Sequence, residues 1–252
     1  MKRVAALAAG LSLLVAGCGD TGDGDTAGKG SGSTLTVFAA ASLTESFTAL
    51  GKTFETSHQG VKVRFNFGGS STLAQQIRQG APADVFAAAS PATMKQVSAT
   101  SQVFTRNRLV IAVPPGNPGK VARLSDLSDR KLKVVLCAEQ VPCGAAATRA
   151  LGAAGVKVEP ASQEQDVKAV LTKVQLGEAD AGLVYRTDAK AAAGRVTGIE
   201  FPESAQAINE YPIVALPTAP RPAPAKEFVQ LVLSAQGQAA LSRAGFESAG
   251  AN

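Results

Sequence analysis

The sequence predicts an α/β protein with mainly parallel sheets, and two observations support this fold class. Short apolar runs typical of buried strands alternate along the chain with segments whose apolar residues recur at helical spacing. Hydrophobic residues make up 45% of the 252 residues, but aromatic residues only 5%, and Trp is absent, so Ala, Val and Leu must build the core. A chain of this length forms one or two domains.

The first half of the chain contains four expected strands and three expected helices. The first helix has a start signal, Ser42-Leu-Thr-Glu45, which matches a capping box. Apolar residues then recur at helical spacing as far as Phe54. We expect strands at 35–38, 61–67, 84–87 and 109–113, and further helices at 70–79 and 91–97.

The same alternation continues in the second half. Apolar or extended segments predict strands, and amphipathic segments predict helices. We expect strands or extended segments at 133–136, 182–185, 199–202 and 211–216, and helices at 144–151, 166–176, 187–193, 225–233 and 238–244. In an α/β protein with parallel sheets, ligands bind where the carboxyl ends of strands meet helix N-termini.

The N-terminus predicts export. Met1-Lys2-Arg3 is positively charged, and the apolar run at 4–16 is too short to span a bilayer, so residues 1–17 are expected to be a signal peptide. The run ends in Val15-Ala16-Gly17-Cys18, which resembles the lipobox of bacterial lipoproteins. The alternative is an ordinary secretion signal with an incidental Cys. Residues 18–33 would then be the lipid-attachment Cys18 and a flexible linker with a reach of about 20 Å.

Charge gives no sign of a nucleic-acid partner. The formal net charge is +5, and loss of Lys2 and Arg3 with the signal peptide leaves +3. The basic residues are scattered rather than clustered, so no nucleic-acid-binding surface is expected.

We expect a monomer on the extracytoplasmic face of the cell membrane, attached through a lipid anchor.

Two further cysteines, Cys137 and Cys143, lie six residues apart. Outside the cytoplasm, nearby cysteines usually oxidise, so we expect a disulfide rather than free thiols, although the sequence leaves both open. A closed zinc site needs four ligands, and His58 is the only histidine, so such a site is not expected.

Three expected strand-to-helix junctions combine small residues with helix-start N–H groups. They are Phe38-Ala-Ala-Ala-Ser42, Phe67-Gly-Gly-Ser-Ser-Thr72 and Val141-Pro-Cys-Gly144. Helix N-termini carry partial positive charge and free N–H donors, which suit anions. The alternative for each junction is simple helix capping by its Ser residue.

Six segments between about Leu35 and Phe246 resemble, in the same order, the periplasmic molybdate-binding proteins of ABC importers. The first three are long and together specific, whereas the other three are weaker when taken alone. The six are Phe38-Ala-Ala-Ala-Ser-Leu-Thr44, Ser70-Ser-Thr-Leu-Ala-Gln-Gln-Ile77, Gly80-Ala-Pro-Ala-Asp-Val-Phe86, Val141-Pro-Cys-Gly144, Glu164-Gln-Asp-Val167 and Gly182-Leu-Val-Tyr185.

The resemblance implies a two-lobed type II periplasmic-binding fold, with helices flanking the sheets and the ligand in the cleft between the lobes. The crossovers would be Leu109–Val113 and Tyr211–Leu216. This places residues 34–112 and 216–252 in lobe I and residues 113–215 in lobe II.

The resemblance also implies the ligand-binding residues. Ser42 and Ser70 would donate hydroxyl and backbone N–H groups, Cys143 and Val167 backbone N–H groups, and Tyr185 its phenol. Cys143 stands where the family commonly has another small residue, and we interpret it as a backbone donor rather than a sulfur ligand. Molybdenum would be bound only as the oxyanion held by these residues, with no cofactor.

The implied function is that of a binding subunit, not an enzyme, which captures molybdate and tungstate for an ABC permease and its ATPase subunits. One alternative is a protein of the same fold for another oxyanion, such as sulfate. A second is an extracytoplasmic hydrolase using Ser42 or Ser70. Against the hydrolase, the chain has no Gly-x-Ser-x-Gly motif, and His58 is expected far from the start of its helix.

Overall fold

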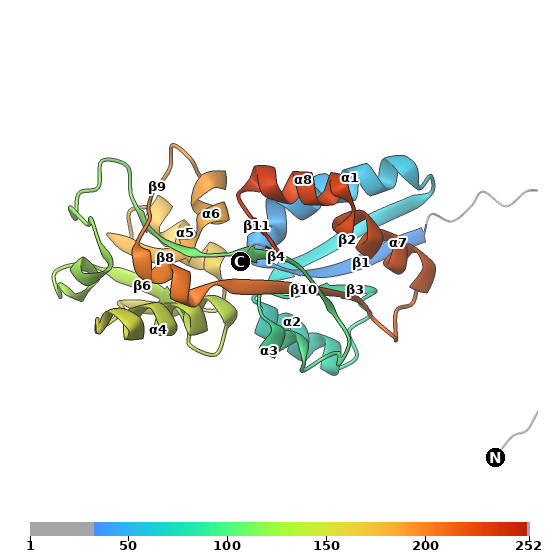
Figure 1. Ribbon diagram of the computed structural model, residues 1–252, viewed down its shortest axis with the longest axis horizontal. Coiled ribbons are helices and arrows are strands. Elements are labelled where there is room, and N and C mark those ends of the chain that lie inside the picture. Colours follow the sequence, from blue (N-terminus) through green and yellow to red (C-terminus); the bar gives the residue numbers. More distant parts are fainter. Residues whose placement is uncertain (1–32, 251–252) are drawn as a thin grey trace, which may run out of the picture. The chain divides into compact units, whose positions relative to one another are not determined.

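The computed structural model describes residues 33–250, which form two β-sheets flanked by helices (Figure 1). The predicted signal peptide (1–17), Cys18 and the predicted linker as far as residue 32 lie outside the described residues. Ser33, the last residue of that linker, begins the first strand. Within the described part, no helix is both long enough and apolar enough to cross a membrane. The α/β fold class is confirmed.

The first sheet, which defines lobe I, has six strands drawn from both ends of the chain. Its spatial order is β11 (Glu247–Ser248), β4 (Gln102–Asn107), β10 (Asn209–Ala215), β3 (Val85–Ala87), β1 (Ser33–Ala40) and β2 (Val61–Gly68). Helices cover both faces of this sheet (Figure 1). One face carries α1 (Thr44–Ser57), α7 (Pro222–Leu233) and α8 (Ala235–Ala244), and the other carries α2 (Ser70–Arg78) and α3 (Pro91–Met94).

The second sheet, which defines lobe II, has five strands from the middle of the chain. Its spatial order is β7 (Ser162–Glu164), β6 (Val134–Cys137), β8 (Ala181–Tyr185), β5 (Leu109–Val113) and β9 (Thr197–Ile199). Three helices flank it: α4 (Pro142–Ala154), α5 (Val167–Gln175) and α6 (Arg186–Ala191). Aliphatic and Ala side chains dominate its core, as the composition predicts.

Both sheets are mixed rather than mainly parallel. β1 pairs in parallel with β2 and β3, and β6 pairs in parallel with β7 and β8. The strands next to the crossovers, β4, β5 and β10, pair antiparallel with their neighbours. The parallel part of the prediction therefore holds only for the βαβ portion of each sheet, because strands that arrive from the other lobe run in the opposite direction.

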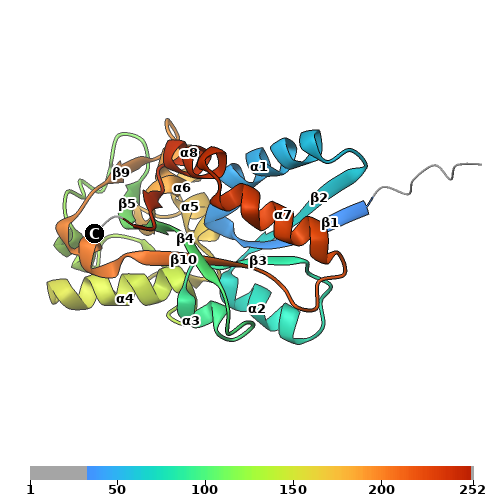
Figure 2. The same ribbon diagram turned by 45° about the vertical axis from the view of Figure 1, so that its right-hand side comes forward.

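The strand pairing corrects both expected crossovers. Leu109–Val113 pairs only with β8 and β9, so it belongs to lobe II, and the passage from β4 to β5 is the single residue Arg108. The 3₁₀ helix η3 (Pro202–Ala207) packs on α4 and β5 of lobe II, so the return passage is Ile208, between η3 and β10. β10 lies entirely in lobe I, beside β4 in both views (Figures 1 and 2). A buried apolar strand looks the same in either sheet, so its sequence could not show which one it joins. We place the lobe boundaries at Arg108 and Ile208.

Candidate functional site

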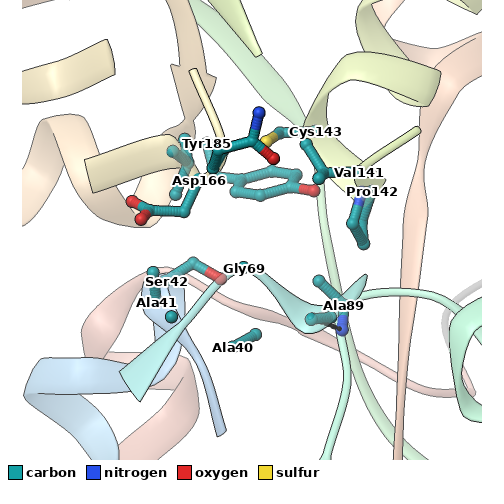
Figure 3. Close-up of a pocket in the computed structure, with 14 residues that line it drawn as sticks. Ala40, Ala41, Ser42, Gly69, Ala89, Val141, Pro142, Cys143, Asp166 and Tyr185 are labelled. Atoms are coloured by element: carbon teal, nitrogen blue, oxygen red, sulfur yellow. Dashed lines mark hydrogen bonds between the residues drawn. The ribbon is translucent and has the colours of Figure 1, made fainter. Parts of the chain in front are cut away.

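A small buried cavity lies between the lobes, where the strand ends of both sheets face each other (Figure 3). All five residues implied by the family resemblance line it: Ser42, Ser70, Cys143, Val167 and Tyr185. Its volume is about 20 Å³. Since one water needs roughly 10–15 Å³ by this measure, the cavity suits a ligand of only a few heavy atoms.

Lobe I contributes two hydroxyls. Ser70 is the first residue of α2, one residue after the end of β2, and its Oγ accepts a hydrogen bond of 3.0 Å from the N–H of Ala89. The hydroxyl hydrogen of Ser70 therefore remains available to a ligand. Ser42 lies in the 3₁₀ turn η1 (Ala41–Leu43) that follows β1.

The capping box predicted at Ser42 is wrong. The first α-helix begins at Thr44, with Leu43 at the N-cap position and no side-chain capping bond. The hydroxyl of Ser42 instead lies 2.8 Å from the phenol oxygen of Tyr211 on β10. The 3₁₀ turn directs Ser42 into the cavity, so this serine contributes to the site rather than to the helix start.

Lobe II contributes two helix starts. Cys143 is the second residue of α4, after Pro142, and Val167 is the first residue of α5. The first N–H groups of a helix have no intrahelical acceptor, so both residues carry unused donors. Asp166 is the N-cap of α5, because its carboxylate accepts a hydrogen bond of 3.0 Å from the N–H of Ala169.

A disulfide joins Cys137 at the end of β6 to Cys143 on α4. It ties the loop that presents the Cys143 N–H to the sheet. The next residue, Gly144, packs so closely that a Cβ added there would lie 1.9 Å from the carbonyl oxygen of Ala138. Only glycine fits at this position without moving the backbone, so the loop has little freedom to shift its donors.

Tyr185, the last residue of β8, completes the set. Its side chain is 1% exposed, and burial raises the pKa of its phenol well above the usual value. The phenol therefore keeps its hydrogen at physiological pH and can act as a donor. Figure 3 shows Tyr185 and Cys143 on one side of the cavity and Ser42 on the other.

The arrangement gathers hydroxyl and N–H donors around one small space, which suits an anion. The structure thus brings together all five predicted residues. Residues 33–250 contain no cluster of His, Cys, Asp or Glu side chains that could hold a metal ion. His58 follows the end of α1, where it stacks on Phe54 and pairs with Glu227, far along the helix from Ser42.

A family model described as "Bacterial extracellular solute-binding protein" matches residues 35–247. The chain belongs to this family. Most of the structure described here, including both lobes and the cavity, falls inside the matched region.

Similar proteins and structures agree with the assignment of this solute-binding protein to that family. Molybdate-binding protein ModA of Mycobacterium tuberculosis is 42% identical over 246 residues, covering 93% of this chain and 94% of the relative. The periplasmic molybdate-binding protein of Azotobacter vinelandii has a TM-score of 0.71 and 21% identity, covering 84% of this chain and 98% of its own. The sulfate-binding protein SubI of Mycobacterium tuberculosis has a TM-score of 0.73 and 19% identity, covering 86% and 88%. These two structures show likeness of fold.

The sequence did not predict that three further residues, each buried or half-buried, lie at the site. Asn209 and Tyr211 on β10 contact Tyr185 and Ser42, respectively. Lys168, next to Val167, pairs with Glu45 of lobe I at 2.7 Å. Nothing local marks these residues, because their roles depend on strands and helices that meet only in the folded chain.

Lys168 also faces a buried carboxylate, with its Nζ 3.1 Å from Oδ1 of Asp188. Burial alone would lower the pKa of Lys168, but Asp188 and Glu45 raise it above the usual value. Burial raises the pKa of Asp188 to about 6, although Lys168 acts in the opposite direction. Lys168 therefore lies between two carboxylates beside the cavity. The carboxylate of Asp166 is also part of the lining, but the groups that can donate to a ligand are neutral.

Proposed function

We propose that this solute-binding protein captures molybdate, and also tungstate, and delivers it to the permease of an ABC importer. The observation that carries the proposal is the convergence of Ser42, Ser70, Cys143, Val167 and Tyr185 on one cavity. The 42% identical relative named for molybdate binding supports the same ligand.

Neutral donors are sufficient for such a ligand. A buried dianion is costly unless its oxygens are hydrogen-bonded, and preorganised N–H and O–H groups supply those bonds without a buried counter-ion. Two of the donors belong to helix starts, where the helix dipole adds partial positive charge. Each lobe contributes some of the donors, so closure around the ion completes the site.

The same chemistry selects among oxyanions. A site made of donors disfavours a ligand that carries a proton, because that proton needs an acceptor. Phosphate is partly protonated near neutral pH and should bind weakly. Sulfate is fully ionised but smaller than molybdate, so the fit of the cavity must separate these two. Tungstate, which is nearly the same size as molybdate, should bind about equally well.

A competition series on the purified protein tests the proposal. Molybdate affinity would be measured by calorimetry alone and in the presence of tungstate, sulfate or phosphate in excess. We expect tungstate to compete strongly, and sulfate and phosphate to compete weakly. If sulfate displaces molybdate at equal concentration, the protein is a binding protein for another oxyanion.

We also propose that the site performs no hydrolysis. A serine nucleophile needs a base within hydrogen-bond reach. Ser42 contacts a tyrosine and Ser70 a backbone N–H, while His58 pairs with Glu227 at the far end of α1. Turnover of generic ester substrates that is abolished by Ser42→Ala would contradict this proposal.

For location and partners, we propose a monomer that is cleaved after residue 17, lipidated at Cys18 and held on the extracytoplasmic face of the membrane. The lipobox-like segment and the polar linker in the sequence support this. Fractionation of a bacterial host tests it. The wild-type protein should stay with the membranes, and Cys18→Ala should release it; equal distribution of both would contradict the anchor.

A further inference from the structure

Asn209, the first residue of β10, lies between the two lobes beside the proposed ligand cavity. Its side chain is 3% exposed, and its Nδ2 lies close to three oxygen atoms. One is the carbonyl of Ala89 in lobe I, at 2.8 Å. The other two are in lobe II: the carbonyl of Pro142 at 3.3 Å and the phenol oxygen of Tyr185 at 2.8 Å.

The neighbours of this amide fix its orientation. Backbone carbonyls can only accept hydrogen bonds, so the NH₂ group must face Ala89 and Pro142. The amide oxygen lies on the other side, 3.4 Å from the Arg149 guanidinium, which can only donate. The Tyr185 phenol oxygen therefore accepts a hydrogen bond from Asn209.

A phenol has one hydrogen, and its direction decides what Tyr185 offers to a ligand. A phenol that accepts from Asn209 has its own hydrogen left to donate, either to a ligand in the cavity or to the phenol of Tyr211, with which Tyr185 also forms a hydrogen bond. Ser70 is arranged in the same way, because its oxygen accepts from the N–H of Ala89. The peptide groups of Ala89 thus act on both hydroxyls: the N–H acts directly on Ser70, and the carbonyl orients Asn209.

We propose that Asn209 is a positioning residue for oxyanion selection: it holds Tyr185 as a hydrogen-bond donor toward the cavity and so biases the site toward fully deprotonated oxyanions. The inference rests on the proposed function of the cavity. Asn209 acts through Tyr185, so its effect on binding exists only while the Tyr185 hydroxyl is present.

A double-mutant cycle on the full chain tests this coupling. Molybdate affinity would be measured by calorimetry for wild type, Asn209→Ala, Tyr185→Phe and the double variant. Asn209→Ala should weaken binding by about ten-fold in the wild-type background, the cost of losing one charge-assisted donor. In the Tyr185→Phe background it should change affinity by less than about two-fold. An equal loss in both backgrounds would overturn the proposal.

Two controls keep the outcome decisive. Asn209→Leu, which preserves side-chain volume, repeats the cycle if thermal melts show that Asn209→Ala is unfolded. Asn66→Ala removes a comparable side-chain bond, to Gln76 in lobe I outside the cavity lining, and should leave affinity unchanged. A wild-type protein that binds no molybdate would refute the proposed function itself, whereas wild-type binding with an additive cycle refutes only the role of Asn209.

Discussion

Two serines near helix starts line the ligand cavity instead of capping their helices. Ser42 and Ser70 each stand near a helix start, where a capping role is the usual interpretation. Neither side chain caps its own helix, and both line the cavity. Their hydroxyls instead contact Tyr211 and the N–H of Ala89. The residue types could be predicted from the sequence, but these partners could not.

Removing the two hydroxyls should weaken binding strongly. Ser42→Ala and Ser70→Ala each remove a donor to a charged acceptor, worth roughly 1.5–3 kcal/mol, or about 10- to 150-fold in affinity. Calorimetric titration with molybdate measures the loss. Ser57→Ala, at the far end of α1, is the matched control and should bind as wild type does. Wild-type affinity in the Ser42→Ala/Ser70→Ala variant would mean that the pocket is elsewhere.

The buried carboxyl of Asp188 should make stability depend on pH. Burial raises its pKa from 3.8 to about 6, so the folded protein holds this proton more tightly than the unfolded chain does. The stability it contributes is present below about pH 4 and is lost as the pH rises through 6. The full loss is on the order of 3 kcal/mol.

Asp188→Asn isolates this effect, because the amide cannot ionise but can still accept from the N–H of Tyr185. Urea unfolding of both proteins at several pH values between 4 and 8 gives the difference in their unfolding free energies. We expect wild type to lose stability relative to Asp188→Asn as the pH rises from 4 to 7. A difference that stays constant with pH would show that Asp188 does not titrate in this range.

At the scale of elements, sequence patterns predicted most helices and strands. The starts of α2 and α5 agree with the expected positions, because polar or glycine residues mark them clearly. Three strands were missed. β11 has only two residues, which is too short to form a pattern, and the other two were missed for physical reasons. β7 is an edge strand of three polar residues, and β4 buries the consecutive residues Phe104 and Thr105, which breaks the alternation expected of a strand.

One contact between elements of different lobes should affect ligand release. Lys168 on α5 pairs with Glu45 on α1, so the pair links lobe II to lobe I beside the cavity. Glu45→Gln breaks this link and leaves Lys168 facing Asp188. A partly exposed pair is worth about 0.2–1 kcal/mol, so we expect molybdate release to be faster by up to about five-fold.

Stopped-flow displacement of bound molybdate measures the release rate. Glu55→Gln is the matched control, because it makes the same change on the same helix but breaks a pair with Lys62 inside lobe I. The effect of Glu45→Gln should also shrink in high salt, which screens exposed charges. Equal release rates for the two variants would argue against an interlobe role for Glu45.

At the scale of the whole molecule, the site exists only because the chain crosses between the lobes twice. The passages at Arg108 and Ile208 bring Ser42 and Ser70 of lobe I to face Cys143, Val167 and Tyr185 of lobe II. The residue pattern alone could not predict this convergence, and the family resemblance supplied it. The same crossovers place Asn209 between the lobes, which no local pattern indicates.

The central claim is that these neutral donors bind molybdate, and calorimetric titration of the purified protein with molybdate tests it most directly. We predict one site per chain, with a dissociation constant in the micromolar range or below, about −8 kcal/mol or stronger. A dissociation constant weaker than millimolar would contradict the account.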